Sequence, residues 1–247
     1  MEYCKDYFIH YYQVDRNRDL TIVSLIRILE DIAILQSEEV GYGLDYYERE
    51  KVGWMLSRWE IKINQLPKFK EKIKLTTRPQ AMNRFYANRY YWLYNEEGDL
   101  LVEAASLWIF FNIEKRRPQA VSREIIDAYA GTDRNEYPFT RLDEVEEVPS
   151  YDYSKKFEVS TDAIDVNNHV NNSRYFSWAL SVVKKEIITN YKISEIRVNY
   201  LKETNINDKV MSFYHSKAEG DGISTLHSMK NEMHEVCRMK IHWTRKQ

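Results

Sequence analysis

The chain has 247 residues, enough for one large domain or two of ordinary size. Hydrophobic residues make up 43% of it, and six tryptophans and nineteen tyrosines add the large side chains that a substantial core requires. Lys and Arg number 36 against 38 Asp and Glu, so the overall charge favours neither nucleic acid nor a membrane surface as a partner.

The compartment can also be predicted. The first residues, MEYCKDYFIHYY, lack the regions of a signal peptide, and no segment approaches the ~20 uncharged residues of a membrane span. The only two cysteines, Cys4 and Cys237, lie far apart, which favours a reducing compartment over a disulfide framework. We therefore expect a cytoplasmic protein without a membrane partner.

The first long element is an amphipathic helix. Leu25, Ile28, Leu29 and Ile32 follow the spacing of a single buried helical face, and Gly41 is placed to end the helix. Strand-like runs follow at 61–79, 84–95 and 100–112, with a hairpin turn at 95–99. The pattern then breaks over 126–150, which contains Pro138, Pro149 and the acidic run 143–147, so we interpret this segment as a linker.

A second helix and a second set of strands follow the break. Asn171 or Asn172 is the expected N-cap of the helix. Its buried face comprises Tyr175, Trp178, Ala179, Val182 and Val183. The later strand-like runs are 195–203, 209–218, 223–230 and 234–244, with a turn at 219–222.

The sequence indicates that the two halves are copies of one unit, with chance similarity between two α+β segments as the alternative. Residues 15–32 align without a gap with 165–182, EIKIN at 60–64 matches EIRVN at 195–199, and Trp108 matches Trp243. The first copy carries extra residues at 36–53. One helix followed by an antiparallel meander predicts an α+β fold in which a sheet wraps around its helix. We therefore expect domains at 1–125 and 151–247, joined by the linker 126–150.

The stretch DAIDVNNHVNN at 162–172 carries the strongest chemical signal. If it is extended, Asp165, Asn167 and His169 project to the same side, directly before a helix N-terminus that can stabilise negative charge on an oxygen. An acid, an amide and an imidazole suit acyl transfer to water. Asp and Asn also serve as caps and turn formers, and a lone His is often a surface group, so a purely structural role remains an alternative.

The wider motif DVNNHVNNSRYFSW resembles the signature of the plant and bacterial acyl-acyl carrier protein thioesterases. SEEVGYG, WMLSRWEIKI and the strand of Trp108 resemble that family too, and its tandem pair of hot-dog domains matches the duplicated plan. The resemblance implies catalytic roles for Asp165, Asn167 and His169, and for a Glu that a Cys follows on a later strand. Here that segment reads NYLKET, so Glu203 is retained and Thr204 replaces the Cys.

The resemblance thus favours direct hydrolysis by water over a thiol mechanism. Asp165 and Glu203 would organise and deprotonate the water, His169 would share the proton, and Asn167 would orient these groups. Which carboxylate takes the proton stays open. Backbone N–H groups at Val170, Asn171 and Asn172 would polarise the thioester carbonyl.

The first copy is expected to be catalytically inert, because Asp19 stands where the second copy has His169. The resemblance gives this copy the role of holding the acyl chain, with 25–37 and 54–63 among its lining segments. The alternative is that these apolar faces are only core.

Expected partners and cofactors are few. No histidine has metal-ligand spacing and no phosphate-binding glycine loop occurs, so we expect neither a metal nor a cofactor. The expected partner is an acyl carrier protein, and a homodimer is allowed. The basic run Lys115-Arg116-Arg117 is either a solvated loop or part of a docking patch for that acidic carrier.

The expected activity is hydrolysis of fatty acyl-carrier thioesters, which would end fatty acid synthesis. An acyl-CoA thioesterase, a hot-dog hydratase and a non-catalytic acyl-binding protein remain alternatives.

Overall fold

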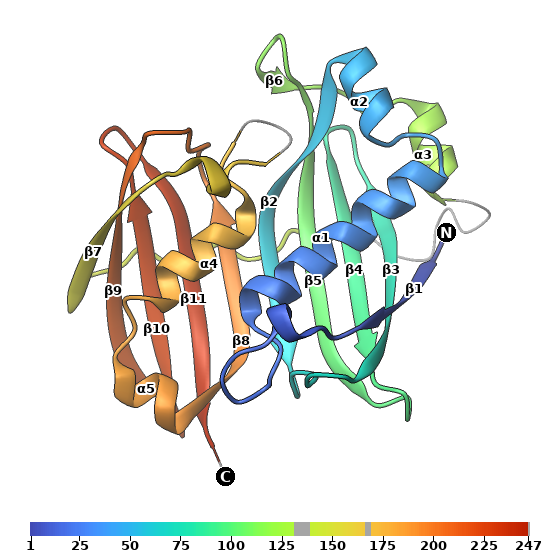
Figure 1. Ribbon diagram of the computed structural model, residues 1–247. Coiled ribbons are helices and arrows are strands. Elements are labelled where there is room, and N and C mark those ends of the chain that lie inside the picture. The colour runs from blue at the N-terminus through green and yellow to red at the C-terminus, as the bar shows by residue number, and fades with distance from the viewer. Residues whose placement is uncertain (131–138, 166–168, 247) are drawn as a thin grey trace. The chain divides into compact units, whose positions relative to one another are not determined.

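The computed structural model describes residues 1–130, 139–165 and 169–246. The chain forms two compact units, one of Met1–Trp59 with Asn64–Leu142 and the other of Glu60–Ile63 with Asp143–Gln247. Each unit is an antiparallel sheet with a helix lying along one face (Figure 1). The predicted α+β class is confirmed. No helix within the described ranges is long and apolar enough to cross a bilayer.

In the first unit the sheet order is β1-β3-β4-β5-β2, and β6 pairs with β5. Its elements are β1 (Tyr3–Phe8), η1 (Tyr11–Gln13), α1 (Ile22–Glu39), α2 (Leu44–Glu50), β2 (Val52–Ile63), β3 (Lys72–Met82), β4 (Tyr86–Tyr94), β5 (Leu100–Asn112), β6 (Arg117–Pro118) and α3 (Arg123–Ala130). Helix α1 contacts β1 and β3.

Local sequence explains where α1 begins and ends. The hydroxyl of its N-cap, Thr21, accepts a hydrogen bond from the Ser24 N–H, and Gly41 follows the helix with a φ of +80°. The predicted face of Leu25, Ile28, Leu29 and Ile32 is buried. These apolar side chains hold the helix to its sheet.

In the second unit the sheet order is β8-β11-β10-β9-β7. Its elements are β7 (Tyr153–Glu158), η2 (Thr161–Ala163), α4 (Asn172–Leu180), α5 (Lys185–Asn190), β8 (Tyr191–Tyr200), β9 (Lys209–Glu219), β10 (Gly222–Lys230) and β11 (Glu235–Arg245). Asn171 is the N-cap of α4, as predicted. Val182 and Val183 are buried as expected, but they lie beyond the end of the helix.

The structure confirms the internal repeat. Both units begin with an edge strand and a 3-10 turn, β1 with η1 in the first and β7 with η2 in the second. Each then closes a short loop with an isolated bridge, between Val14 and Leu20 in the first unit and between Ile164 and Val170 in the second. The duplication thus extends to the loop that carries the candidate catalytic residues.

The hairpin turns are confirmed by positive φ at Gly98 and Gly220, whereas the run 61–79 is wrong as a single strand. It spans the end of β2, a loop and most of β3. In that loop Lys70 has a φ of 76°, and its N–H bonds to the Ile9 carbonyl rather than to a neighbouring strand. The backbone therefore leaves the sheet within a stretch whose pattern still favours β structure.

The expected linker also differs from the structure. Residues Arg123–Ala130 form α3, and Ile125 and Tyr129 are buried in a cluster with Val52 and Phe110. The first unit therefore continues past residue 125. An amphipathic helix joins its core where we expected a connection.

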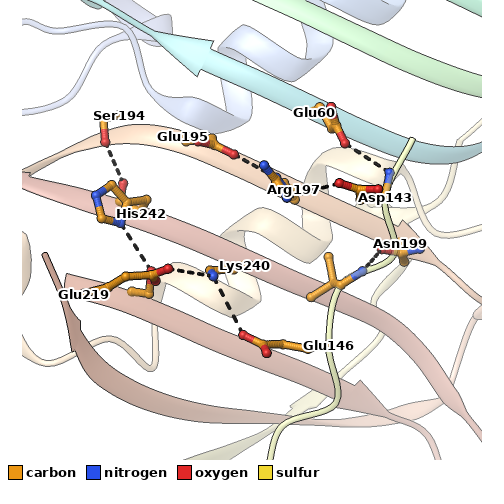
Figure 2. A network of polar contacts seen from close by, with 12 residues as sticks. Glu60, Asp143, Glu146, Ser194, Glu195, Arg197, Asn199, Glu219, Lys240 and His242 are labelled. Atoms are coloured by element: carbon orange, nitrogen blue, oxygen red, sulfur yellow. Dashed lines mark hydrogen bonds and ion pairs between the residues drawn. The ribbon is translucent and has the colours of Figure 1, made fainter. Parts of the chain in front are cut away.

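The acidic run 143–147 is bound to the second unit (Figure 2). Its ion pairs are Asp143–Arg197 at 3.7 Å, Glu146–Lys217 at 3.0 Å, Glu146–Lys240 at 3.7 Å and Glu147–Arg238 at 3.0 Å. The buried Val145 donates its N–H to Asn199 Oδ1 at 2.7 Å. These contacts fix the run against strands β8, β9 and β11.

Candidate active site

The candidate site is built on the loop between η2 and α4. The Asp165 N–H donates to the His169 carbonyl at 2.9 Å, and the His169 N–H donates to Asp165 Oδ1 at 3.3 Å. These two hydrogen bonds hold the backbones of Asp165 and His169 next to each other. Asn167, with Val166 and Asn168, lies outside the described residues.

The loop brings His169 to Glu203, which follows the end of β8. Their side chains approach with His169 Nε2 3.5 Å from Glu203 Oε2. The two side chains are 35% and 27% exposed, so both are accessible to water and a substrate. A carboxylate beside an imidazole can take a proton from water and pass it on. Residues that the sequence separates by more than 30 positions thus meet in one site.

Thr204 ties this pair to the core of the second unit. The Val170 N–H donates to the Thr204 carbonyl at 3.0 Å, and the Tyr175 hydroxyl donates to Thr204 Oγ1 at 2.8 Å. Thr204 is 1% exposed, and burial raises the pKa of Tyr175 above its ordinary value. Thr204, which stands where the resemblance leads us to expect a Cys, is therefore a buried hydrogen-bonding group directly after Glu203 in the chain.

Sequence reasoning missed this use of Tyr175. Its place on the buried face of α4 was predicted, but the role of its hydroxyl was not. The Tyr200 hydroxyl, likewise unassigned, donates to the Asn172 carbonyl at 3.2 Å. A tyrosine on an apolar face signals such a bond, because a buried phenol needs a hydrogen-bond partner.

Two of the three amides expected to face the thioester carbonyl are already used. The Val170 N–H bonds to Thr204, and the Asn171 N–H bonds to the Ala163 carbonyl at 2.8 Å. The Asn171 side chain caps α4 by accepting from the Ser173 N–H at 2.9 Å. The assignment of Val170 and Asn171 as carbonyl-polarising donors is therefore wrong in this arrangement, because their protons point to protein oxygens.

The first unit contains the same loop without the same chemistry. Asp15 Oδ1 accepts from the Asp19 N–H at 3.1 Å, and the Leu20 N–H donates to the Pro67 carbonyl at 2.8 Å. The latter bond matches the one from Val170 to Thr204, so Leu66 stands where Glu203 stands in the second unit. The first copy therefore has no counterpart of the His169 imidazole or of the Glu203 carboxylate.

The two cysteines are the other candidate nucleophiles. Cys237 is fully buried on β11, as expected, and burial raises the pKa of its thiol well above its ordinary value. Cys4 is exposed on β1. Within the described ranges, no group of three His, Cys, Asp or Glu side chains is arranged to hold a metal ion.

Both halves of the sequence match one family. Residues 1–129 match the acyl-ACP thioesterase N-terminal domain, and residues 146–245 match the acyl-ACP thioesterase C-terminal domain. The chain belongs to the acyl-ACP thioesterase family. Oleoyl-acyl carrier protein thioesterase 2, chloroplastic, of Arabidopsis thaliana is 24% identical over 91% of this chain. The alignment covers 65% of that relative, so the chain spans less than two thirds of its length.

Solved structures of similar proteins share the fold. A putative oleoyl thioesterase from Lactobacillus plantarum superposes with a TM-score of 0.90 at 23% identity, covering 100% of this chain and 97% of the other. The 12:0-ACP thioesterase from Umbellularia californica superposes with a TM-score of 0.86 at 19% identity, covering 99% and 94%. The tandem hot-dog fold expected from the sequence is therefore confirmed.

Proposed function

We propose that this chain hydrolyses fatty acyl thioesters of acyl carrier protein, releasing free fatty acid and the holo-carrier. Membership of the family supports the activity. The observation that carries the proposal is the contact between His169 and Glu203, because it pairs a base with an imidazole at the motif that the family match covers.

The proposed reaction needs one water molecule and no cofactor. Glu203 or Asp165 takes a proton from the water as its oxygen attacks the thioester carbonyl carbon. That carboxylate passes the proton to His169. The tetrahedral intermediate then collapses, the carbon–sulfur bond breaks, and His169 gives the proton to the departing thiolate. Asn167 would orient these groups, and the first turn of α4 at Asn172 would favour the negative oxygen through the helix dipole.

The first unit would hold the acyl chain, and the carrier would dock through exposed basic side chains. Three clusters are exposed: Lys115-Arg116-Arg117, Lys155-Lys156 and Lys184-Lys185. A cytoplasmic location belongs to the same proposal, whereas the Arabidopsis relative is named as a chloroplastic protein. A homodimer remains a further expectation.

A thiol-release assay tests the activity. Purified protein is given palmitoyl, oleoyl and shorter acyl groups, each on the carrier and on CoA, and the free thiol is measured. We expect release with the carrier substrates and a lower kcat/KM with CoA. A preference for carrier substrates that persists at high salt would argue against electrostatic docking, since salt screens exposed charges.

The same assay separates the alternatives. A higher kcat/KM with CoA would make the protein an acyl-CoA thioesterase. Hydration of an enoyl thioester without thiol release would make it a hydratase. Acyl binding without turnover of any thioester would make it a binding protein, and each of these results would overturn the proposal.

A further inference from the structure

The first unit contains a buried guanidinium that the proposed reaction does not use. Arg89 on β4 is 7% exposed. The hydrogen bonds that its guanidinium makes to described residues all come from Nη1, which donates to Gln36 Oε1 and to Thr77 Oγ1. Its Nε and Nη2 atoms therefore have no protein acceptor among those residues. Neither atom is among the buried polar atoms without a hydrogen-bond partner, so both keep some contact with solvent and can be reached by a ligand oxygen.

Arg89 also lacks a counter-ion within the described part of the chain. No carboxylate there lies within ion-pair distance of it. Its guanidinium lies over the Tyr129 ring at 5.9 Å, and burial raises the pKa of the neighbouring Tyr47 and Tyr91, so both phenols stay neutral. The positive charge is met only by neutral groups.

These donors line a cavity. The cavity measures about 30 Å³, which admits a group of only a few heavy atoms. The Tyr129 hydroxyl is occupied by a bond to Ser37 Oγ at 2.7 Å. The polar residues of the lining are Ser37, Tyr47, Asn88, Arg89 and Tyr129. Ala33, Ile34, Trp54, Met82 and Trp108 form apolar walls. The cavity thus has room for a carboxylate beside Arg89, and its apolar walls would contact the first carbons of the chain that carries it.

We propose that Arg89 binds a carboxylate carried at the end of an apolar chain, with Nε and Nη2 donating one hydrogen bond to each oxygen. Those two N–H groups are parallel, which is the geometry of a bidentate arginine–carboxylate pair. A carboxylate supplies the missing charge, which an alcohol or a methyl terminus cannot.

Two sources carry this chemistry. One is a free fatty acid bound with its head toward Arg89, which would act as an inhibitor. The other is an acyl substrate that carries a carboxylate at the end remote from the thioester, and this source rests on the proposed function.

Binding measurements test the site without relying on activity. Decanoate, decan-1-ol and methyl decanoate are titrated into the full-length protein, with the tryptophan fluorescence of Trp54 and Trp108 as the readout. We expect decanoate to bind at least roughly tenfold more tightly than the two neutral compounds, because bidentate charged hydrogen bonds are the strong ones. Equal affinities for the three compounds would overturn the proposal.

Two variants place the binding at Arg89. Gln36→Glu puts a carboxylate of nearly the same shape against Nη1, so the pocket supplies its own counter-ion and the preference for decanoate should disappear. Arg89→Lys keeps the charge but removes the paired Nε and Nη2 donors, so the preference for decanoate should fall. Circular dichroism can verify that the fold persists. The exposed Arg123→Gln, whose parent residue pairs with Asp127 at 3.2 Å, is the matched control and should retain the preference. Unchanged decanoate binding in both pocket variants would overturn the assignment.

Hydrolysis assays then show whether the bound carboxylate belongs to a free fatty acid or to the acyl substrate. Competitive inhibition by decanoate, lost in Gln36→Glu, assigns the site to free fatty acid. A kcat/KM for an ω-carboxyacyl thioester above that of the unsubstituted acyl thioester, lost in the same variant, assigns it to the substrate. If neither occurs while decanoate binds at Arg89, the link to the reaction is wrong and the binding site stands. If no thioester is hydrolysed at all, the proposed function fails but the binding result is unaffected.

Discussion

His169 lies in a loop and Glu203 follows the end of a strand, and in the proposed reaction each needs the other to move a proton. Substituting one member removes a positioned acid–base group, which typically contributes ~10²–10⁴-fold to rate. We therefore expect His169→Ala and Glu203→Gln each to lower kcat by about that factor. Steady-state kinetics on one acyl-carrier substrate, with circular dichroism to check folding, measure the effect. A loss of less than threefold in both variants would remove the pair from the mechanism.

The cysteines provide a second test at the residue scale. Cys237 is fully buried and its thiol has a raised pKa, so it is a poor nucleophile. We expect Cys237→Ala to retain turnover and to lose about 1 kcal/mol of stability through packing. Alkylation of the exposed Cys4 in the native protein, verified by mass spectrometry, should also leave activity intact. A loss of several orders of magnitude in the folded Cys237→Ala variant would revive a thiol mechanism.

The sequence could predict that His169 and Glu203 belong to one candidate site, but only in part how they are held. His169 and Glu203 were assigned through the family motif, and the structure brings them together. The use of the Val170 and Asn171 amides could not be foreseen, since it depends on which carbonyls the fold places opposite them. The Tyr175–Thr204 bond likewise joins a helix to a strand end, and no local pattern encodes that register.

At the scale of elements, the buried face of α1 and the runs that correspond to β5, β9, β10 and β11 were predicted well, whereas the start of β2 and the helix α3 were not. The buried face and the end of α1 follow from local periodicity and Gly41, whereas β2 begins at Val52, nine positions before the predicted run at 61–79. Strands depend on partners distant in sequence, so their ends are set by the sheet. The helix α3 was missed because its stabilising cluster with Val52 and Phe110 is tertiary.

Strand β10 carries a histidine that should make the fold sensitive to acid. His227 is fully buried, and burial lowers its pKa to about 3. Its Nε2 lies 3.0 Å from Thr225 Oγ1, and Nδ1 has no hydrogen-bond partner. An unfolded histidine titrates near 6.5, so between these values only the unfolded chain binds the proton. Stability is therefore complete above about pH 6.5 and falls on acidification by at most about 1.4 kcal/mol per pH unit.

Urea unfolding at pH 7 and pH 5 measures this effect. We expect His227→Leu to lose less stability than the parent protein between these two values, by up to about 2 kcal/mol. The exposed His234→Gln is the matched control and should follow the parent. If His227→Leu and the parent lose the same amount, His227 is not the group that titrates on unfolding.

At the scale of the whole molecule, one unit occurs twice and its two copies have diverged in chemistry more than in fold. Both loops close through an aspartate, Asp15 in the first copy and Asp165 in the second. That shared bond indicates that part of the aspartate's role is structural. In the proposed mechanism, the two copies differ at two positions, Asp19 against His169 and Leu66 against Glu203.

This divergence predicts unequal effects of matched variants. Asp15→Asn and Asp165→Asn both keep an oxygen that can accept the loop N–H, so both loops should remain closed. Only the second removes a charge beside His169, and we expect it to lower kcat by ~10²-fold or more while Asp15→Asn and Asp19→Asn leave kcat nearly unchanged. The three variants are compared on one acyl-carrier substrate, with thermal unfolding to match their stabilities.

Because His169 and Glu203 would act on the same water, the double variant His169→Ala/Glu203→Gln should be scarcely slower than the worse single variant. Equal losses in the first-copy and second-copy variants would mean that the two copies share the catalytic site, and multiplicative losses in the double variant would mean that His169 and Glu203 act in separate steps.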